Sequence, residues 1–252
     1  MAAAAALMIM VPPLKPSQAL TLTFPLIYKS SLKPSLTKMA LHITASASAS
    51  ASAITNRKLP VLLFDIMDTI VRDPFNHDIP AFFGMSMKEL LECKHPTAWI
   101  EFEKGLIDEM ELERIFFKDG RHFDLEGLKS CIYQGYSYLE GVEELLCALK
   151  DNGYEMHAFT NYPIWYRMIE DKLKLSSYLS WTFCSCIIGK RKPDPDFYSE
   201  VLKHLDTEPK NCVFVDDRIK NVDAAKETGI NGIQFKNADS LRHDLSLLGV
   251  TL

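Results

Sequence analysis

The stretch LLFDIMDTIV, residues 62–71, passes from apolar side chains to two acidic ones within a few positions. Residues 60–64, PVLLF, have the short, uninterrupted apolar character of a buried strand. Asp65 follows this predicted strand directly, and Asp68 comes three positions later. An acid after a strand is in itself more often a helix cap than a site residue. Its meaning therefore depends on the rest of the chain.

Short apolar runs alternate with helical patterns along the remaining sequence. Besides residues 60–64, the predicted strands are 155–159, 182–186, 212–215 and 232–235. Apolar side chains at spacings of three and four predict amphipathic helices at 141–153, 164–175, 196–205 and 218–229. This alternation predicts an α/β fold, in which helices cover both faces of a parallel sheet.

One insertion interrupts the alternation. The 95 positions from Asp65 to Thr160, which ends the second predicted strand, far exceed what one crossover helix needs. Further helical patterns occur at 86–93, 97–105, 108–120 and 124–136. A structureless loop of this length is implausible. Residues 76–138 are therefore predicted to form a small helical cap, inserted into a core made of residues 58–75 and 139–252.

Polar residues follow four of the predicted strands. They are Asp65, then Thr160 with Asn161, then Lys192, then Asp216 with Asp217. The carboxyl ends of parallel strands meet at one edge of a sheet, where ligands bind in such folds. Asp65 and Asp217 would hold a divalent cation, while Lys192 and Thr160 would donate to phosphoryl oxygens. The set predicts phosphoryl transfer.

Four segments carry a resemblance to a known superfamily. FDIMDT, FTN, GKRKPDPDFY and FVDDRIKN match, in order and spacing, the four motifs of the haloacid dehalogenase superfamily. The insertion after the first motif is similar to the class 1 helical cap of that superfamily. The resemblance implies a Rossmann-like core with a parallel five-stranded sheet, a bound Mg²⁺ ion and an aspartyl-phosphate intermediate.

The same resemblance implies a role for each matching residue. Asp65 would be the nucleophile. Asp65, Asp217 and the backbone carbonyl of Met67 would hold the magnesium ion. Thr160 and Lys192 would bind the phosphoryl group. Asp216 would lie behind the residues that touch the substrate, and Asn221 would support the fourth motif.

Met67 departs from the superfamily pattern. Its phosphatases usually carry DxDxT, in which the second acid protonates the leaving oxygen and then deprotonates the attacking water. Here Met67 occupies that place, and a thioether transfers no proton at neutral pH. We expect another acid to act as proton donor: Asp68 if the turn swings it inward, or a cap residue such as His77 or Glu103.

Two other functions are compatible with this departure. One is a dehalogenase, a branch in which the second acid is also replaced, but that branch lacks the acidic pair that Asp216 and Asp217 form here. The other is a binding or regulatory protein that holds a nucleotide without turnover, because a fold does not fix a function.

Longer stretches resemble plant plastid members of the superfamily that hydrolyse flavin mononucleotide. These stretches are LLFDIMDTIVRDPF, FFGMSMKELLECKHP, AFTNYPIWY and WTFCSCIIGKRKPDP. The resemblance implies cleavage of a small phosphate ester, flavin mononucleotide, to riboflavin and phosphate. Among the many aromatic residues, Trp99 and Tyr162 are predicted to face the flavin ring, with Asn161 as a polar contact.

The N-terminal segment has the composition of a targeting sequence. Residues 1–55 contain no acidic side chain, are rich in alanine and serine, and end near the tract ASASASASA. This predicts a plastid transit peptide and a location in the chloroplast stroma. A signal peptide is the alternative for the run AAAAALMIMV, but no basic residue precedes that run, which is also too short to span a bilayer.

The charge of the remaining chain narrows the possible partners. After the six basic residues that precede Asp65 are set aside, 22 basic residues stand against 33 acidic ones, a formal charge of −11. Such a chain repels polynucleotide phosphates, so neither nucleic acid nor membrane is a predicted partner. The sequence does not predict an oligomeric state.

Overall fold

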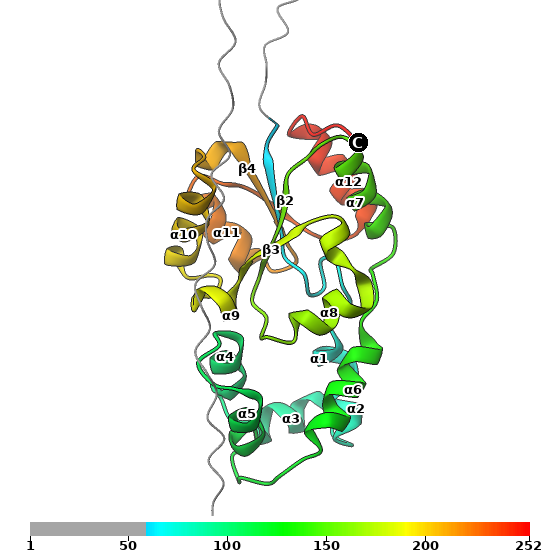
Figure 1. Cartoon of the computed structure of the whole chain (residues 1–252), viewed down its shortest axis with the longest axis vertical. Coiled ribbons are helices and arrows are strands. Elements are labelled where there is room, and N and C mark those ends of the chain that lie inside the picture. Colours follow the sequence, from blue (N-terminus) through cyan, green and yellow to red (C-terminus); the bar gives the residue numbers. More distant parts are fainter. Residues whose placement is uncertain (1–58) are drawn as a thin grey trace, which may run out of the picture. The chain divides into compact units, whose positions relative to one another are not determined.

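The computed structural model describes residues 59–252, and the predicted transit peptide lies outside them. Five strands form one sheet: β1 (Val61–Phe64), β2 (Met156–Thr160), β3 (Ser180–Cys184), β4 (Cys212–Asp216) and β5 (Asn231–Gln234). Their order is β3-β2-β1-β4-β5, and every neighbouring pair is parallel (Figure 1). The predicted α/β fold with a parallel five-stranded sheet is confirmed, and each strand lies within two residues of its predicted range.

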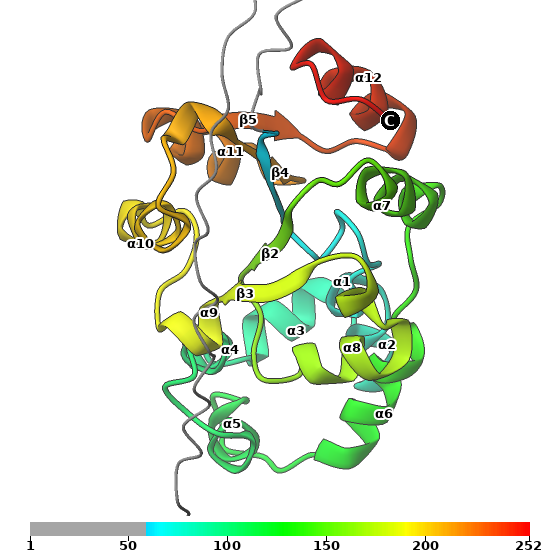
Figure 2. The ribbon, with the colours of Figure 1, turned by 45° about the horizontal axis from the view of Figure 1, so that its top comes forward.

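Helices cover both faces of the sheet, as Figure 2 shows. One face packs against α7 (Val142–Asp151), α8 (Tyr166–Leu173) and α12 (Ala238–Leu247); the other packs against α10 (Pro195–Leu205) and α11 (Ile219–Glu227). Alternate residues of β1 point to opposite faces: Leu62 and Phe64 belong to the first apolar cluster, Val61 and Leu63 to the second. The central strand is thus buried on both sides, which explains its uninterrupted apolar run.

Six helices occupy the chain between β1 and α7. They are α1 (Pro74–His77), α2 (Ile79–Phe82), α3 (Met87–Cys93), α4 (Ala98–Glu103), α5 (Glu109–Ile115) and α6 (Leu125–Gly135). We call residues 74–135 the helical insertion. In Figure 1 it lies beyond the end of the sheet at which β1 terminates. Four of these six helices, α1, α3, α5 and α6, begin at side chains that accept a hydrogen bond from the first turn: Asp73, Ser86, Asp108 and Asp124.

The short helix α9 (Ser185–Ile188) differs from the predicted structure. The alternation in WTFCSC predicts a strand through residue 186, but β3 ends at Cys184. The buried hydroxyl of Ser185 donates to the carbonyl of Glu103 (2.5 Å) and accepts from the backbone N–H of Tyr162 (2.9 Å). These tertiary hydrogen bonds turn the chain and override the local pattern. Two 3-10 turns, η1 (Leu175–Ser177) and η2 (Pro209–Asn211), complete the elements.

Within residues 59–252, the helices are too short or too polar to cross a membrane.

Gly105 marks a close approach between the insertion and the core. A Cβ atom at this residue would stand 2.6 Å from the carbonyl oxygen of Cys186, and Gly105 has a left-handed φ of +68°. Gly120 has a similar φ of +72°, but a Cβ there would meet nothing within 4 Å.

Gly120→Ala should therefore lower the free energy of unfolding by about 1 kcal/mol, from the backbone conformation alone. Gly105→Ala should cost about 1–3 kcal/mol more, because of the clash. Urea denaturation measures both, and equal losses would contradict the close approach.

Candidate active site

The register of the sheet brings the predicted site residues to one edge. Phe64 on the central strand pairs with Ala158 of β2 and Val215 of β4. Asp65 follows Phe64, and its backbone N–H donates to the Val215 carbonyl (2.9 Å). Because all three strands run in the same direction, Asp65, Thr160 and Asp216 end side by side. Their side chains are buried.

Lys192 links the strand ends through its ammonium group. Nζ lies 2.9 Å from Oδ1 of Asp65 and 2.6 Å from Oδ2 of Asp216, and it donates to the Phe159 carbonyl at 2.6 Å. The Lys192 side chain is 1% exposed. Burial by itself lowers the pKa of Lys192, but the charges of Asp216 and Asp65 outweigh it and hold the pKa above its ordinary value. Lys192 is thus a fixed positive charge inside the site.

The carboxyl group of Asp65 has a strongly raised pKa. Burial raises its pKa to about 7, against the opposing pull of the Lys192 ammonium. A divalent cation at this carboxylate would favour the ionised form.

Asn161 holds the backbone of Lys192. Its Oδ1 accepts from the Lys192 N–H, and its Nδ2 donates to the Lys192 carbonyl, both at 2.8 Å. The sequence predicted a substrate contact for Asn161. Although Asn161 lines the cavity described below, its amide is engaged on both sides, so its role in this structure is to position Lys192.

Asp216 and Asn221 form the support behind the cluster. Asn221 Nδ2 lies 3.0 Å from each carboxylate oxygen of Asp216, and the Arg218 N–H donates to Asp216 Oδ1 at 2.8 Å. The carbonyl of Asn221 in turn accepts from the hydroxyl of Tyr198 at 2.8 Å. Asp216 is therefore fully engaged by protein donors.

The acidic residues at this edge fit a hard divalent cation. Carboxylate oxygens of Asp65, Asp216 and Asp217 lie within 4.8 Å of one another. Asp217 Oδ1 is buried and makes no hydrogen bond within residues 59–252. Oxygen ligands of this kind suit Mg²⁺. The predicted ligand set of Asp65 and Asp217 is compatible with this arrangement, and the Met67 carbonyl stays a prediction.

A second orphaned atom lies at the same edge. The hydroxyl oxygen of Thr160 is buried and has no hydrogen-bond partner in the described part of the chain. A buried hydroxyl without a partner costs stability unless a ligand or water satisfies it. The predicted contact between Thr160 and a phosphoryl oxygen would satisfy it.

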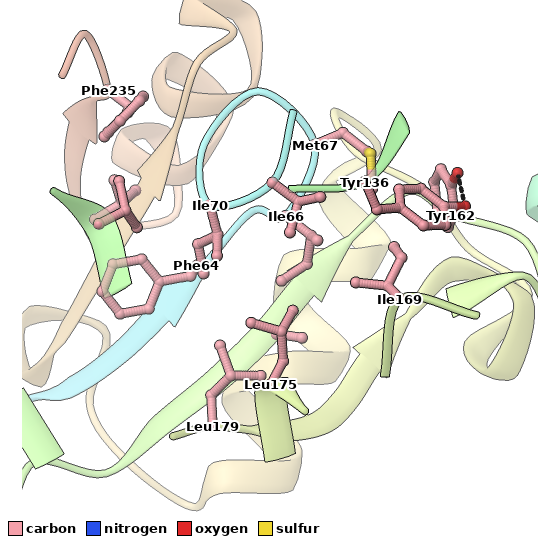
Figure 3. Close-up of a cluster of buried hydrophobic side chains, with 14 of the residues drawn as sticks. Phe64, Ile66, Met67, Ile70, Tyr136, Tyr162, Ile169, Leu175, Leu179 and Phe235 are labelled. Carbon is pink, nitrogen blue, oxygen red and sulfur yellow. Dashed lines mark hydrogen bonds between the residues drawn. The ribbon is translucent and has the colours of Figure 1, made fainter. Parts of the chain in front are cut away.

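A cavity of about 240 Å³ joins this edge to the helical insertion. Asp65, Lys192 and Met67 line it, and so do the predicted aromatic residues Trp99 and Tyr162. The Met67 side chain is nearly buried and lies beside Tyr162 in an apolar cluster (Figure 3). The cavity is therefore lined by both charged and apolar side chains.

A partly buried ion pair between two residues that line this cavity was not predicted from the sequence. Glu103 on α4 accepts from Arg191 through Oε2 and from Trp99 Nε1 through Oε1, both at 2.8 Å. Burial raises the pKa of Glu103, although Arg191 and Trp99 oppose the shift. Eighty-eight positions separate Glu103 from Arg191, and no local pattern signals such a pairing.

Asp68 does not occupy the position that a proton donor needs. It adopts a left-handed φ of +54°, and its carboxylate accepts from the Asp73 N–H (3.0 Å) and from Asn76 Nδ2 (3.2 Å). Neither Asp68 nor the exposed His77 lines the cavity. The turn therefore directs Asp68 to the start of α1 instead of inward. Asp73, which sequence reasoning did not single out, does line the cavity.

The fold and this cluster of charges define a class of protein. Residues 60–229 match the haloacid dehalogenase-like hydrolase family, and the chain belongs to it. The chain is also 69% identical over 196 residues to flavin mononucleotide hydrolase 1 of Arabidopsis thaliana, which is named as chloroplastic. That match covers 78% of this chain and 80% of the relative. A glyceraldehyde 3-phosphate phosphatase of Pyrococcus furiosus is 25% identical to this chain over 211 residues. That match covers 75% of this chain and 85% of the phosphatase.

Solved structures support the fold. A HAD family enzyme from Bacteroides thetaiotaomicron, in complex with magnesium and inorganic phosphate, superposes with a TM-score of 0.59 at 18% identity. The match covers 74% of this chain and 98% of that enzyme. The magnesium complex of the same enzyme gives a TM-score of 0.61.

Removing the Lys192 charge should destabilise the protein strongly. Lys192→Met leaves Asp216 buried with no neutralising cation, so the free energy of unfolding should fall by about 3–5 kcal/mol. Lys190→Met is the matched control, because Lys190 lies two residues away in a partly exposed pair with Glu200 (3.5 Å). It should change the stability by less than about 1 kcal/mol. Thermal or urea unfolding measures both variants, and a loss below about 1 kcal/mol for Lys192→Met would contradict the proposed linkage.

Proposed function

We propose that this chain is a magnesium-dependent phosphomonoester hydrolase that converts flavin mononucleotide to riboflavin and phosphate in the chloroplast. The substrate and the location rest on the 69% identity to the Arabidopsis enzyme and its printed name. In this proposal residues 1–55 are the transit peptide, residues 76–138 are the cap, and the remaining residues from 58 onward form the catalytic core.

One observation carries the proposed chemistry. A buried ammonium group bridges Asp65 and Asp216, and two buried oxygens beside it, of Thr160 and Asp217, have no partner in the described chain. Such a cluster can hold a phosphate dianion and its counter-charge at fixed positions, which is most of what phosphoryl transfer requires. The acidic pair at the end of β4, Asp216 and Asp217, also favours a metal-dependent phosphatase over a dehalogenase.

The roles of the residues follow from their chemistry. Asp65 attacks phosphorus and forms an aspartyl phosphate. Lys192 and Thr160 donate to the phosphoryl oxygens, and Asp216 keeps Lys192 in place. Asp65, Asp217 and the Met67 carbonyl hold magnesium, which when bound neutralises charge on the phosphoryl group.

The helical insertion would select the substrate. Trp99 of the insertion lines the same cavity as Asp65, together with Tyr162 from the core segment after β2. The face of an aromatic side chain can stack against a flat heterocycle such as isoalloxazine. Trp99 is fixed for this purpose by its hydrogen bond to Glu103.

Asp65→Asn should abolish phosphate release from flavin mononucleotide. The amide keeps the size of the carboxylate but is not a nucleophile, so kcat should fall on the order of 10³-fold or more. Phosphate and riboflavin are measured after incubation with magnesium. Asp239→Asn, on the exposed surface of α12, is the matched control and should keep full activity. Turnover by Asp65→Asn at the rate of the unchanged protein would exclude Asp65 as the nucleophile.

Magnesium removal should abolish the same reaction, and Asp217 should set the affinity for the metal. EDTA should stop phosphate release and added Mg²⁺ should restore it. Asp217→Asn removes one proposed ligand, so half-maximal activity should need about 10-fold more Mg²⁺ or more. A magnesium titration of activity, together with the Mg²⁺-dependent rise of Tm, measures this change. An unchanged magnesium requirement would remove Asp217 from the ligand set.

A further inference from the structure

Hydrolysis of an alkyl phosphate needs a proton on the leaving oxygen. Met67, two positions after Asp65, has no proton to give, and its side chain is held in the apolar cluster with Tyr136 and Tyr162, whose hydroxyl groups lie 2.7 Å apart (Figure 3). The proposed reaction therefore requires a proton-transfer group elsewhere on the cavity wall.

We propose that Asp73 is the catalytic acid and base of this site. Its carboxyl group would protonate the leaving ester oxygen, and the resulting carboxylate would deprotonate the attacking water. This inference rests on the proposed phosphatase function. It assigns to Asp73 the proton transfer that Met67, at the usual position of the second acid, cannot perform.

The geometry leaves one oxygen of Asp73 available. Asp73 is buried, with 7% of its surface exposed, and lines the same cavity as Asp65 and Lys192. Its backbone N–H donates to Asp68 Oδ1, and its own Oδ1 accepts from the Phe75 N–H at 2.9 Å. Oδ2 makes no hydrogen bond within residues 59–252 and is free to meet a substrate oxygen. The two backbone contacts hold the side chain in place.

The other carboxyl groups are less suited to this role. Among the described residues, the acids that line this cavity are Asp65, Asp73 and Glu103. Asp65 is the proposed nucleophile. Both oxygens of Glu103 already accept hydrogen bonds, from Arg191 and Trp99, and the positive charge of Arg191 favours the ionised carboxylate over the acid. Asp73 is the one that remains.

The surroundings of Asp73 favour a proton near neutral pH. Burial raises its pKa to about 6, while the Phe75 N–H and the Arg218 charge oppose the shift. The titratable and charged groups closest to it are Asp68, Arg72, Asp217, Arg218, Tyr136 and Tyr162. Lys94, Glu103 and Arg191 also line the cavity. A group that is half protonated near pH 6 can serve as acid in one step and as base in the next.

The two steps balance with Asp73 restored. In the first, a bond forms between an Asp65 oxygen and phosphorus, the bond from phosphorus to the ester oxygen breaks, and the Asp73 proton goes to that oxygen. In the second, a water oxygen bonds to phosphorus, the bond to Asp65 breaks, and a water proton goes to Asp73. The products are the alcohol and inorganic phosphate.

Asp73→Asn tests the assignment without removing the helix cap, because the amide oxygen can still accept from the Phe75 N–H. For flavin mononucleotide, kcat should fall by about 10²–10⁴-fold. For p-nitrophenyl phosphate, whose leaving group needs no proton, the variant should still release one equivalent of nitrophenolate rapidly and then turn over slowly. Stopped-flow absorbance measures this burst, and a merely structural role for Asp73 would slow both substrates alike from the first turnover.

The pH profile gives a second readout. For the unchanged protein, kcat/KM for flavin mononucleotide should fall as pH rises through about 6, because Asp73 must be protonated in the first step. This limb should disappear in Asp73→Asn. Asp68→Asn is the matched control, because its amide oxygen can still accept from the Asp73 N–H; the limb should remain but move to lower pH, because the Asp68 charge no longer helps to raise the pKa of Asp73. The limb should remain in Glu103→Gln as well.

Folding is checked separately from the proposed function. Asp73→Ser is a second variant, which keeps a capping side chain but has no carboxyl group. If they fold normally, Asp73→Asn and Asp73→Ser should both bind riboflavin and show the Tm of the unchanged protein. Loss of activity and of the pH limb in either folded variant supports the inference. An Asp73 variant within about threefold of the unchanged rate, or one that keeps the limb, overturns this inference alone. Absence of phosphate release by the unchanged protein overturns the proposed function and this inference together.

Discussion

The buried ammonium group of Lys192 is the constraint on which the rest of the site depends. It lies between two carboxylates and a carbonyl that come from three adjacent strands. Taking these charges out of water is costly, and close contacts must offset the cost. The aromatic rings of Phe159 and Phe214 exclude water around the ammonium, with centroids 5.2 and 4.9 Å away. The same aromatic side chains therefore pack the core of the sheet and surround the charge at its edge.

Sequence patterns predicted the parts of the protein that local or periodic rules control. The apolar run 60–64 predicted the central strand, because a strand buried on both faces has no polar side. Asp65, Thr160 and Asp216 converge because parallel strands end together, a rule that needs no contact information. The support of Asp216 by Asn221 is also where its motif predicted it.

The remaining parts depend on contacts that are distant in sequence or on one backbone angle. The sequence suggested Asp68 as a proton donor. In the structure, its left-handed φ of +54° directs its carboxylate toward the start of α1. The helix α9 begins where Ser185 bonds to Glu103, 82 positions earlier. Asp73 carried no signal, because an aspartate before proline is an ordinary helix cap. Whether such a cap also lines a cavity is decided by how the insertion packs.

Arg191 and Lys192 are adjacent in the chain but bind different parts of the molecule. Arg191 pairs with Glu103 on the helical insertion, whereas Lys192 pairs with Asp65 and Asp216 on the sheet. One short piece of backbone therefore carries the ion pair to the helical insertion and the buried charge cluster of the sheet. The helical insertion and the charged edge of the sheet are thus held by neighbouring residues and do not form independently of each other.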